Sequence, residues 1–411
     1  MTEIFAKAKN ASYSFMGETT AKKNAILEKI VHFLDEKRDY IVSENKKDLE
    51  NGVKNGLSDA LIDRLKLDDK RIDSMISGVK EIIAQDDPVG SIVSGYRRPN
   101  GLNIYKVRVP IGVVGIIYES RPNVTIDAAA LCIKSGNVCI LRGGKEAINS
   151  NLALGNIIKE ALLSEKIQEN VCIVLNDPDR VLMEKMLKAK QYIDIIVPRG
   201  GEGLIKYCTE NSLIPLVKHD KGLCHVYIDE FADIKKGIDI AYNAKVQRPG
   251  VCNAIETLLV HKNVYRNVLD TLIEKYKSAG VEIVGCDVVS KTYNTKLATE
   301  EDWQTEYLAL KISIKVVDSV KSAIEHINKY GSGHSEAIVT ENYSNAQEFL
   351  NKVDAAAVYV NASTRFTDGA EFGLGAEIGI STQKLHCRGP MGAFDLTTTK
   401  YLIYGNGQVR N

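Results

Sequence analysis

QRPGVCNAIETLLVH, residues Gln247–His261, is the stretch on which the fold and the chemistry of this chain depend. It contains a loop broken by Pro249 and Gly250, a single cysteine, Cys252, and an apolar run, Ile255–Val260, that predicts a strand. A thiol on a tight loop next to a strand is a typical position for a nucleophile, because glycine lets a ligand approach the backbone and the thiolate is reactive. The alternative is a structural cysteine, since free thiols are often simply small buried apolar groups.

The composition is that of an ordinary globular protein of two or three domains. The 411 residues include 53 Lys and Arg and 53 Asp and Glu, so the formal net charge is zero and nothing global indicates binding to nucleic acid or to an anionic membrane. We find no apolar run long enough for a signal peptide or a membrane span. The eight cysteines are scattered without a CxxC pair. This pattern predicts reduced thiols in a cytoplasmic protein, with no metal site.

The first part of the chain has helical periodicity and no recognisable chemistry. We predict one long helix from about Glu18 to Glu50, and further helices at Ser58–Leu67 and Asp69–Gln85, the last capped by Asp68 or Asp69.

From Asn103 onward, short apolar strands alternate with helices. Asn103–Val109 is predicted to be a solvated or edge strand, whereas Val113–Tyr118 is a continuous apolar run typical of a buried parallel strand. The alternation continues in two sets, one before and one after His225, which predicts an α/β fold with two doubly wound domains. The tail Leu396–Arg410 predicts an edge strand that pairs with another subunit.

Two turns of the first set combine arginine with glycine: Leu141–Lys145 (LRGGK) and Pro198–Gly201 (PRGG). Ligands of doubly wound sheets bind beyond the carboxyl ends of the strands, and a helix N-terminus with glycines and a cation favours phosphate. These turns therefore predict a site for a phosphate-bearing cofactor, unless they are ordinary turns with solvated arginines. The usual dinucleotide fingerprint and a Walker A motif are both absent.

Eight motifs, in order, resemble the aldehyde dehydrogenase superfamily and, more closely, its gamma-glutamyl phosphate reductases. They are YESRPNVTIDAAALCIKSGN, LRGGKEA, PRGGEGLI, QRPGVCNAIETLLVH, WQTEYLALKISIKVV, HINKYGSGHSEAI, FGLGAEIGIST and RGPMGAFDLTTTKYLIYGNGQ. The resemblance covers essentially the whole chain. It implies an aldehyde-dehydrogenase-like fold with three parts: a cofactor-binding domain (residues 1–98, 110–230 and 365–393), a catalytic domain (231–364) and oligomerisation strands (99–109 and 394–411).

The resemblance also implies roles for single residues. Cys252 occupies the nucleophile position, and Asn123 occupies the position of the oxyanion-hole amide, although from the residues alone Asn123 would be interpreted as a helix N-cap. Glu306 corresponds to the residue that holds the nicotinamide ribose. The adenosine and pyrophosphate side corresponds to Arg142, Gly143, Lys145, Arg199, Gly200 and Gly201, and either Arg142 or Lys145 could take the superfamily's lysine role. Candidates for the substrate's phosphate or α-carboxylate are Arg121, His219 and His334, and a plain surface-loop role for His334 is an equal alternative.

One departure from the superfamily bears on the reaction. Aldehyde-oxidising members have a glutamate base that activates water, whereas the corresponding segment here, Lys218–His225, contains no glutamate. We expect Glu256 to structure the site without touching the thiol. The missing base favours reduction of an activated acyl group over oxidation of an aldehyde.

The resemblance therefore implies NADPH-dependent reduction of gamma-glutamyl phosphate to glutamate 5-semialdehyde through a Cys252 thioester, in proline biosynthesis. It implies a free-standing cytoplasmic homo-oligomer, functionally coupled to glutamate 5-kinase, without nucleic acid, membrane or metal. The residues do not separate NADPH from NADH. Three alternatives stay open: an enzyme of the same fold with another small acyl or aldehyde substrate, a non-catalytic binding protein, and a cysteine hydrolase.

Overall fold

The computed structural model describes residues 2–177, 179–218 and 221–410, and it divides into two compact units. The first unit comprises Met1–Lys218, Gly373–Gly379 and Pro390–Asn411, and the second comprises His219–Phe372 and Ile380–Gly389. The expected boundary at residues 230/231 differs from this division. The reason is that strand β7 (Cys224–Ile228) pairs with strands of the second unit. None of the described helices combines the length and the apolar character needed to cross a bilayer.

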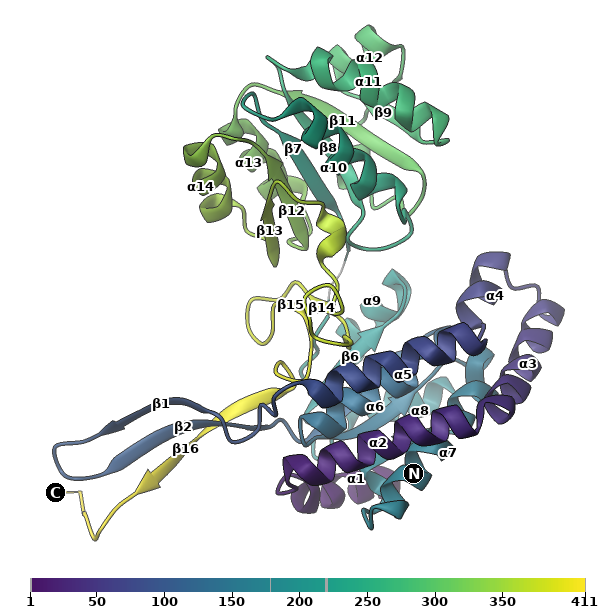
Figure 1. Cartoon of the computed structure of the whole chain (residues 1–411), viewed down its shortest axis with the longest axis vertical. Helices are drawn as coiled ribbons and strands as arrows, with labels where there is room; N and C mark the ends of the chain where they lie inside the picture. Colours follow the sequence, from purple (N-terminus) through teal and green to yellow (C-terminus); the bar gives the residue numbers. More distant parts are fainter. Residues whose placement is uncertain (1, 178, 219–220, 411) are drawn as a thin grey trace. The chain divides into compact units, whose positions relative to one another are not determined.

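Five helices open the first unit (Figure 1). They are α1 (Thr2–Phe15), α2 (Thr20–Glu36), α3 (Arg38–Lys54), α4 (Asp59–Leu65) and α5 (Asp69–Ala84). The prediction of one long helix over residues 18–50 is wrong, because the helix is interrupted at Lys37. Neither a glycine nor a proline marks this interruption in the sequence. The predicted cap of α5 is confirmed at Asp68, whose carboxylate accepts a hydrogen bond from the N–H of Arg71.

A four-stranded parallel sheet in the order β5-β4-β3-β6 forms the centre of this unit. All six residues of β3 are buried, as its continuous apolar run predicts. The connecting helices follow the expected strand–helix alternation. The elements are β3 (Val113–Tyr118), α6 (Val124–Lys134), β4 (Val138–Arg142), η1 (Lys145–Ala147), α7 (Ile148–Ser164), η2 (Glu169–Val171), β5 (Cys172–Val174), α8 (Arg180–Lys188), β6 (Ile195–Arg199) and α9 (Glu202–Asn211).

A separate antiparallel sheet has the order β1-β2-β16 (Figure 1). Its strands are β1 (Ile92–Arg97), β2 (Asn103–Pro110) and β16 (Thr397–Tyr404). The C-terminal edge strand is confirmed, but β2 lies between two partners and so is not an edge strand. The sequence pattern did not reveal β1, whose six residues are all exposed and therefore lack an apolar run.

The second unit is a seven-stranded parallel sheet in the order β10-β9-β11-β8-β7-β12-β13. Its elements are β7, α10 (Ile234–Val246), β8 (Ile255–His261), α11 (Tyr265–Ser278), β9 (Glu282–Gly285), α12 (Asp287–Tyr293), β10 (Lys296–Leu297), η3 (Asp302–Gln304), β11 (Lys311–Val317), α13 (Val320–Tyr330), β12 (Ser335–Val339), α14 (Tyr343–Lys352), β13 (Ala357–Val360), η4 (Thr364–Phe366) and the short strand β14 (Ile380–Ser381). The short strand β15 (Gly389–Pro390) lies where the chain passes from the second unit to the first.

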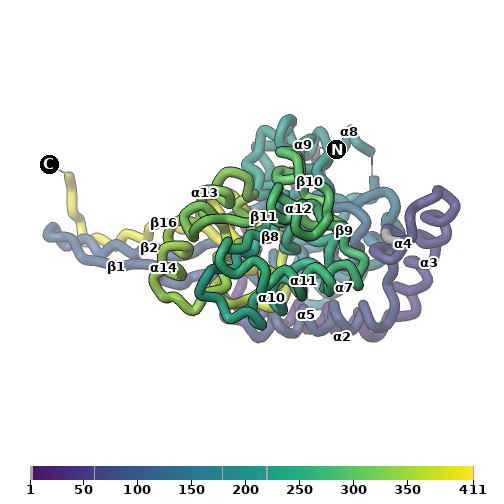
Figure 2. Tube along the Cα trace, turned by 90° about the horizontal axis from the view of Figure 1, so that it is seen from above, coloured from purple at the N-terminus to yellow at the C-terminus, as the bar shows by residue number. Residues whose placement is uncertain are grey.

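Alternating side chains on the central strands fill two cores, one on each face of this sheet. On β7 and β8, Val226 and Leu258 belong to the core with α10 and α11, which lie side by side (Figure 2). Their neighbours Tyr227 and Leu259 belong to the opposite core, which includes residues of α13 and α14. Since successive side chains of a strand point to opposite faces, helices cover both faces and the unit is doubly wound, as predicted.

Candidate nucleophile and cofactor sites

Cys252 lies in the loop between α10 and β8, so it stands at the amino end of its strand. It is half-buried, and all eight cysteines are free thiols. The backbone carbonyl of Cys252 accepts a hydrogen bond from the buried Cys224 thiol at 3.1 Å. A side chain on Gly222 would collide with the backbone and Cβ of Cys252, so only glycine fits there. Gly222, which precedes β7, and Cys224, at its start, therefore pack against the Cys252 loop and hold its backbone in position.

The other candidate residues of the second unit gather at the same edge of the sheet. Glu306 precedes β11, and His334 directly precedes β12, as Cys252 precedes β8. His334 is buried rather than lying on a surface loop. Its Nδ1 is 2.8 Å from Ser335 Oγ and 3.8 Å from Cys224 Sγ. Because these strands are parallel, their amino ends share one edge, and Cys252, Glu306 and His334 all precede strands at that edge.

A buried ion pair supports this edge. Lys245 of α10 donates to Glu256 of β8 at 2.6 Å, and neither side chain is accessible to solvent beyond 1%. The second carboxylate oxygen of Glu256 accepts a hydrogen bond from the N–H of Leu308, two residues after Glu306. Burial raises the pKa of Glu256 to about 7 and lowers the pKa of Lys245. These contacts agree with the expected structural role of Glu256.

In the first unit, the two arginine–glycine turns follow β4 and β6, which flank β3 on either side. All three strands are parallel, so both turns lie at one carboxyl edge, where open α/β sheets bind ligands. Arg142 is buried at the end of β4, and burial lowers the pKa of its guanidinium. Arg199 ends β6 with Nη2 3.7 Å from Glu377. Gly143 is required because a Cβ there would collide with the Asn151 amide.

Two carboxylates tie these turns to the end of β3. Glu119 accepts a hydrogen bond from the N–H of Gly201, the N-cap of α9, at 2.9 Å, and its side chain occupies the space that a Cβ on Gly200 would need. Glu146 accepts from the N–H and the hydroxyl of Ser120, both at 2.8 Å. An exposed N–H at a helix N-terminus that takes a carboxylate can equally take a phosphate. The donors at this edge, with exposed Lys145, therefore fit the phosphates of a dinucleotide.

Asn123 lies at the N-cap position of α6, but its side chain makes no capping hydrogen bond. Instead, Nδ2 donates to Asp127 Oδ2 at 2.9 Å, one turn along the helix. The capping interpretation of Asn123 is therefore wrong for its side chain. Burial raises the pKa of Asp127 to about 6. Since a side-chain amide carries two N–H hydrogens, the bond to Asp127 orients Nδ2 and leaves one hydrogen for another acceptor.

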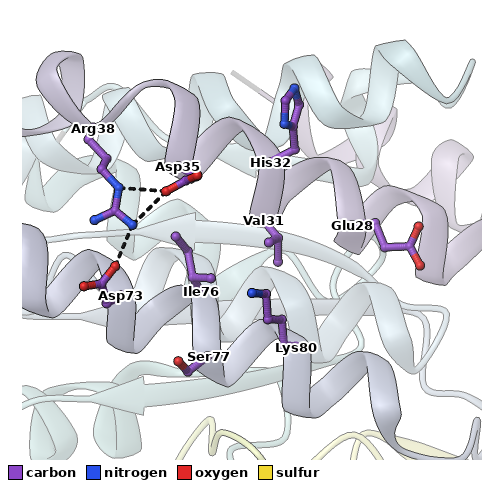
Figure 3. A pocket seen from close by; sticks show the side chains of 9 residues that line it. All are labelled: Glu28, Val31, His32, Asp35, Arg38, Asp73, Ile76, Ser77 and Lys80. Carbon is purple, nitrogen blue, oxygen red and sulfur yellow. Dashed lines mark hydrogen bonds and ion pairs between the residues drawn. The ribbon is translucent and has the colours of Figure 1, made fainter.

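The remaining candidates carry less information. Arg121 is exposed in the turn before α6, and His219 lies outside the described residues. A surface pocket of about 540 Å³ lies between α2 and α5 (Figure 3). Its arginine, Arg38, is already paired with Asp35 and Asp73. The pocket is lined by Glu28, Val31, His32, Asp35, Arg38, Asp73, Ile76, Ser77 and Lys80.

Several site residues had no signal in the sequence pattern. Glu119 and Asp127 lie inside a recognised motif, yet only the folded backbone shows that they hold Gly201 and Asn123. Cys224 resembles any buried strand cysteine until its contact with Cys252 is known. A search for polar residues one helical turn after Asn123 would have found Asp127.

The comparisons with known proteins cover most or all of the chain. The model of the aldehyde dehydrogenase family matches residues 1–287 and 299–376. The chain is 54% identical to the gamma-glutamyl phosphate reductase of Nautilia profundicola, over 100% of both sequences. It superposes on the crystal structure of gamma-glutamyl phosphate reductase from Thermotoga maritima with a TM-score of 0.97, at 48% identity over 100% of this chain and 99% of that one. An acetylating aldehyde dehydrogenase from Geobacillus thermoglucosidasius shares the fold, with a TM-score of 0.71 at 17% identity over 100% of this chain and 97% of that one.

Proposed function

We propose, because this chain belongs to the aldehyde dehydrogenase family and, within it, to the gamma-glutamyl phosphate reductases, that it reduces gamma-glutamyl phosphate to glutamate 5-semialdehyde and inorganic phosphate in proline biosynthesis. The full-length identity of 54% carries this proposal. The loop of Cys252, fixed by Gly222 and Cys224, supplies the nucleophile that the reaction needs.

The proposed reaction begins with the thiolate of Cys252. Its Sγ attacks the γ-carbonyl carbon, the bond from this carbon to the phosphate oxygen breaks, and inorganic phosphate leaves with the electron pair. A thioester on Cys252 remains. The resemblance assigns the transient oxyanion to the amide of Asn123 and the backbone N–H of Cys252, and loss of one such donor typically lowers the rate by about 10²–10³.

The cofactor in this proposal is NADPH. When bound, it would supply a hydride to the thioester carbon; the carbon–sulfur bond then breaks, which releases the aldehyde and restores the Cys252 thiolate. Glu306 would hold its ribose, and Arg142, Gly143, Lys145, Arg199, Gly200 and Gly201 would hold its adenosine and phosphates. Arg121, His219 and His334 remain candidates for binding the substrate's own anionic groups.

The thioester must survive until it is reduced, so water must not be activated beside it. The segment Lys218–His225, which corresponds to the one carrying the hydrolytic glutamate in aldehyde-oxidising relatives, contains no glutamate. The structure places Gly222 and Cys224 of this segment directly against Cys252. We therefore propose that this segment favours phosphate, not water, as the group that reacts with the thioester in the reverse direction. From the resemblance, we also propose that the enzyme is a cytoplasmic homo-oligomer coupled to glutamate 5-kinase.

The reverse reaction tests the proposal most directly. Glutamate 5-semialdehyde and NADP⁺ are supplied with and without inorganic phosphate, and formation of reduced cofactor is followed. We expect the native chain to require phosphate, Cys252→Ala to be inactive, and Cys286→Ala, which removes a half-buried thiol elsewhere in the second unit, to match the native rate. Equal rates without phosphate would show that water resolves the thioester, and the chain would then be an oxidising aldehyde dehydrogenase.

A further inference from the structure

We propose that Arg365 is a substrate-binding residue, whose guanidinium binds an oxyanion of the acyl substrate beside Cys252. This inference rests on the proposed function, since it concerns the substrate of the same thiol. Gamma-glutamyl phosphate offers two such groups, the α-carboxylate and the acyl phosphate. The α-carboxylate is planar and the phosphate is tetrahedral, and a guanidinium can bind two oxygens of either group through two parallel N–H donors.

The turn that carries Arg365 is attached to the nucleophile loop through the residue after Cys252. The hydroxyl of Thr364 donates to the backbone carbonyl of Asn253 at 2.7 Å. In return, the side-chain amide of Asn253 donates to the carbonyl of Thr367 at 2.8 Å. Asn253 is buried, so these bonds are shielded from water. The position of η4 relative to Cys252 is therefore set by the fold of the second unit.

The guanidinium of Arg365 spans the nucleophile loop. Its Nε donates to Gln247 Oε1 at 2.8 Å, and its Nη1 donates to Asn253 Oδ1, so the two contacts lie on either side of Cys252 in the sequence. Both acceptors are neutral amides. They orient the group without neutralising its charge, and they leave Nη2 without a hydrogen-bond acceptor among the described residues.

The local charge is unusual for a half-buried arginine. Several other arginines pair with carboxylates, as Arg388 does with Asp354 at 2.8 Å. Arg365 forms no ion pair within the described residues, and its neighbours include a second cation, Arg248. Burial and Arg248 lower the pKa of Arg365, whereas the carboxylate of Asp368 and then negative charge on Cys252 raise it. Asp368 acts on Arg365 without forming an ion pair with it among the described residues, so the guanidinium can still bind an anion directly, and the substrate of Cys252 is one.

A purely structural role would use the same two hydrogen bonds to hold the loop in place. The two roles separate when charge and loop contacts are changed independently. Arg365→Lys keeps a positive charge but loses the fork, Arg365→Gln loses the charge, and Gln247→Ala removes a loop contact while keeping the guanidinium. Arg388→Lys is the matched control for loss of a guanidinium that is paired with a carboxylate.

The first measurement needs no turnover. Cys252 is alkylated with iodoacetamide in the presence of inorganic phosphate or L-glutamate, for the native chain and the variants. We expect one of these anions to slow alkylation of the native chain and of Arg388→Lys, and to protect Gln247→Ala less than the native chain but more than Arg365→Gln, because Gln247→Ala loses one orienting contact and keeps the charge. The concentration that gives half-protection should rise about tenfold or more in Arg365→Gln, the size of one lost charge-assisted hydrogen bond. Protection that is the same in Arg365→Gln as in the native chain would overturn the proposal, as would an equal loss in Gln247→Ala.

The second measurement identifies the bound group. In the reverse reaction, the KM for phosphate and the KM for glutamate 5-semialdehyde are determined separately for the native chain and for Arg365→Lys. A rise in the KM for phosphate assigns Arg365 to the phosphoryl group, and a rise in the KM for the semialdehyde assigns it to the α-carboxylate. A fall in kcat with both KM values unchanged contradicts substrate binding. Absence of phosphate-dependent turnover in the native chain would refute the proposed function, while the alkylation result would still decide the role of Arg365.

Discussion

Asn123 links the proposed oxyanion site to pH through a single hydrogen bond. Its amide donates to Asp127 Oδ2 at 2.9 Å, and burial raises the pKa of Asp127 to about 6. As the pH falls through about 6, the carboxylate is protonated and the amide loses its charged acceptor. We expect kcat of the native chain to fall over this range, and the fall to be smaller in Asp127→Asn, whose amide oxygen accepts at every pH.

The measurement is kcat between about pH 5 and pH 8 for both proteins, with saturating substrates. An identical acid limb in both profiles would assign the titration to another group. The effect on folding has the opposite sign. Because the pKa of Asp127 is raised in the folded chain, its contribution to stability is present at low pH and is lost as the pH rises through about 6.

How far single residues could be predicted depended on whether they belong to a motif. Cys252, Asn123 and the arginine–glycine turns could be proposed as site residues because short-range sequence patterns mark them. Arg365, for which we propose a substrate-binding role, had no signal in the sequence, because its contact with Asn253 joins residues 112 positions apart and no local pattern records such a distance. The cap interpretation of Asn123 failed for a similar reason, since its choice of Asp127 as partner depends on side-chain geometry.

At the scale of elements, α10 and β8 are joined by the buried pair of Lys245 and Glu256. At a pH well above 7, where Glu256 is ionised, Glu256→Gln removes one charge and leaves the ammonium of Lys245 buried without its counterion, which destabilises by up to about 3–5 kcal/mol. We expect a clear fall in melting temperature for Glu256→Gln. The double variant Lys245→Met, Glu256→Met should recover part of it, because no unpaired charge remains.

The recovery of melting temperature in the double variant is the result that tests the ion pair. It is measured by thermal unfolding of the native chain, Glu256→Gln and the double variant. A double variant that is less stable than Glu256→Gln would show that the bond from Leu308 N–H to the Glu256 carboxylate dominates over the ion pair. Cofactor binding provides a second measurement. Since this bond fixes the backbone beside Glu306, we expect the double variant to bind cofactor more weakly even where its stability recovers.

Buried elements were the easiest to predict. Strands β3 and β8 agree with their expected ranges because continuous apolar runs belong to strands that are covered on both faces. Strand β1 is fully exposed and so has no such run, and it was missed. The break between α2 and α3 was missed because the residue at the break, Lys37, is not a helix breaker.

At the scale of the whole molecule, the sheet β1-β2-β16 leaves apolar side chains in water. Tyr401, Ile403 and Tyr404 of edge strand β16 are 57–59% exposed, and Ile92 and Tyr96 of the opposite edge strand are 64% and 51% exposed. Unpaired edge strands with apolar side chains are ready to pair with another chain. We therefore expect the native protein to be a homo-oligomer that forms through this sheet.

The variant Tyr401→Lys, Ile403→Lys tests this expectation, because it places two charges on one face of β16 without touching the sites of either unit. We expect its mass in solution, measured by light scattering, to fall toward that of a single chain, 45.3 kDa. Tyr343→Lys, at a 77% exposed position on α14, is the control and should keep the native mass. If the double variant also keeps the native mass, then oligomers do not form through β16. A native protein that is already monomeric would show that the exposed edge is tolerated in water.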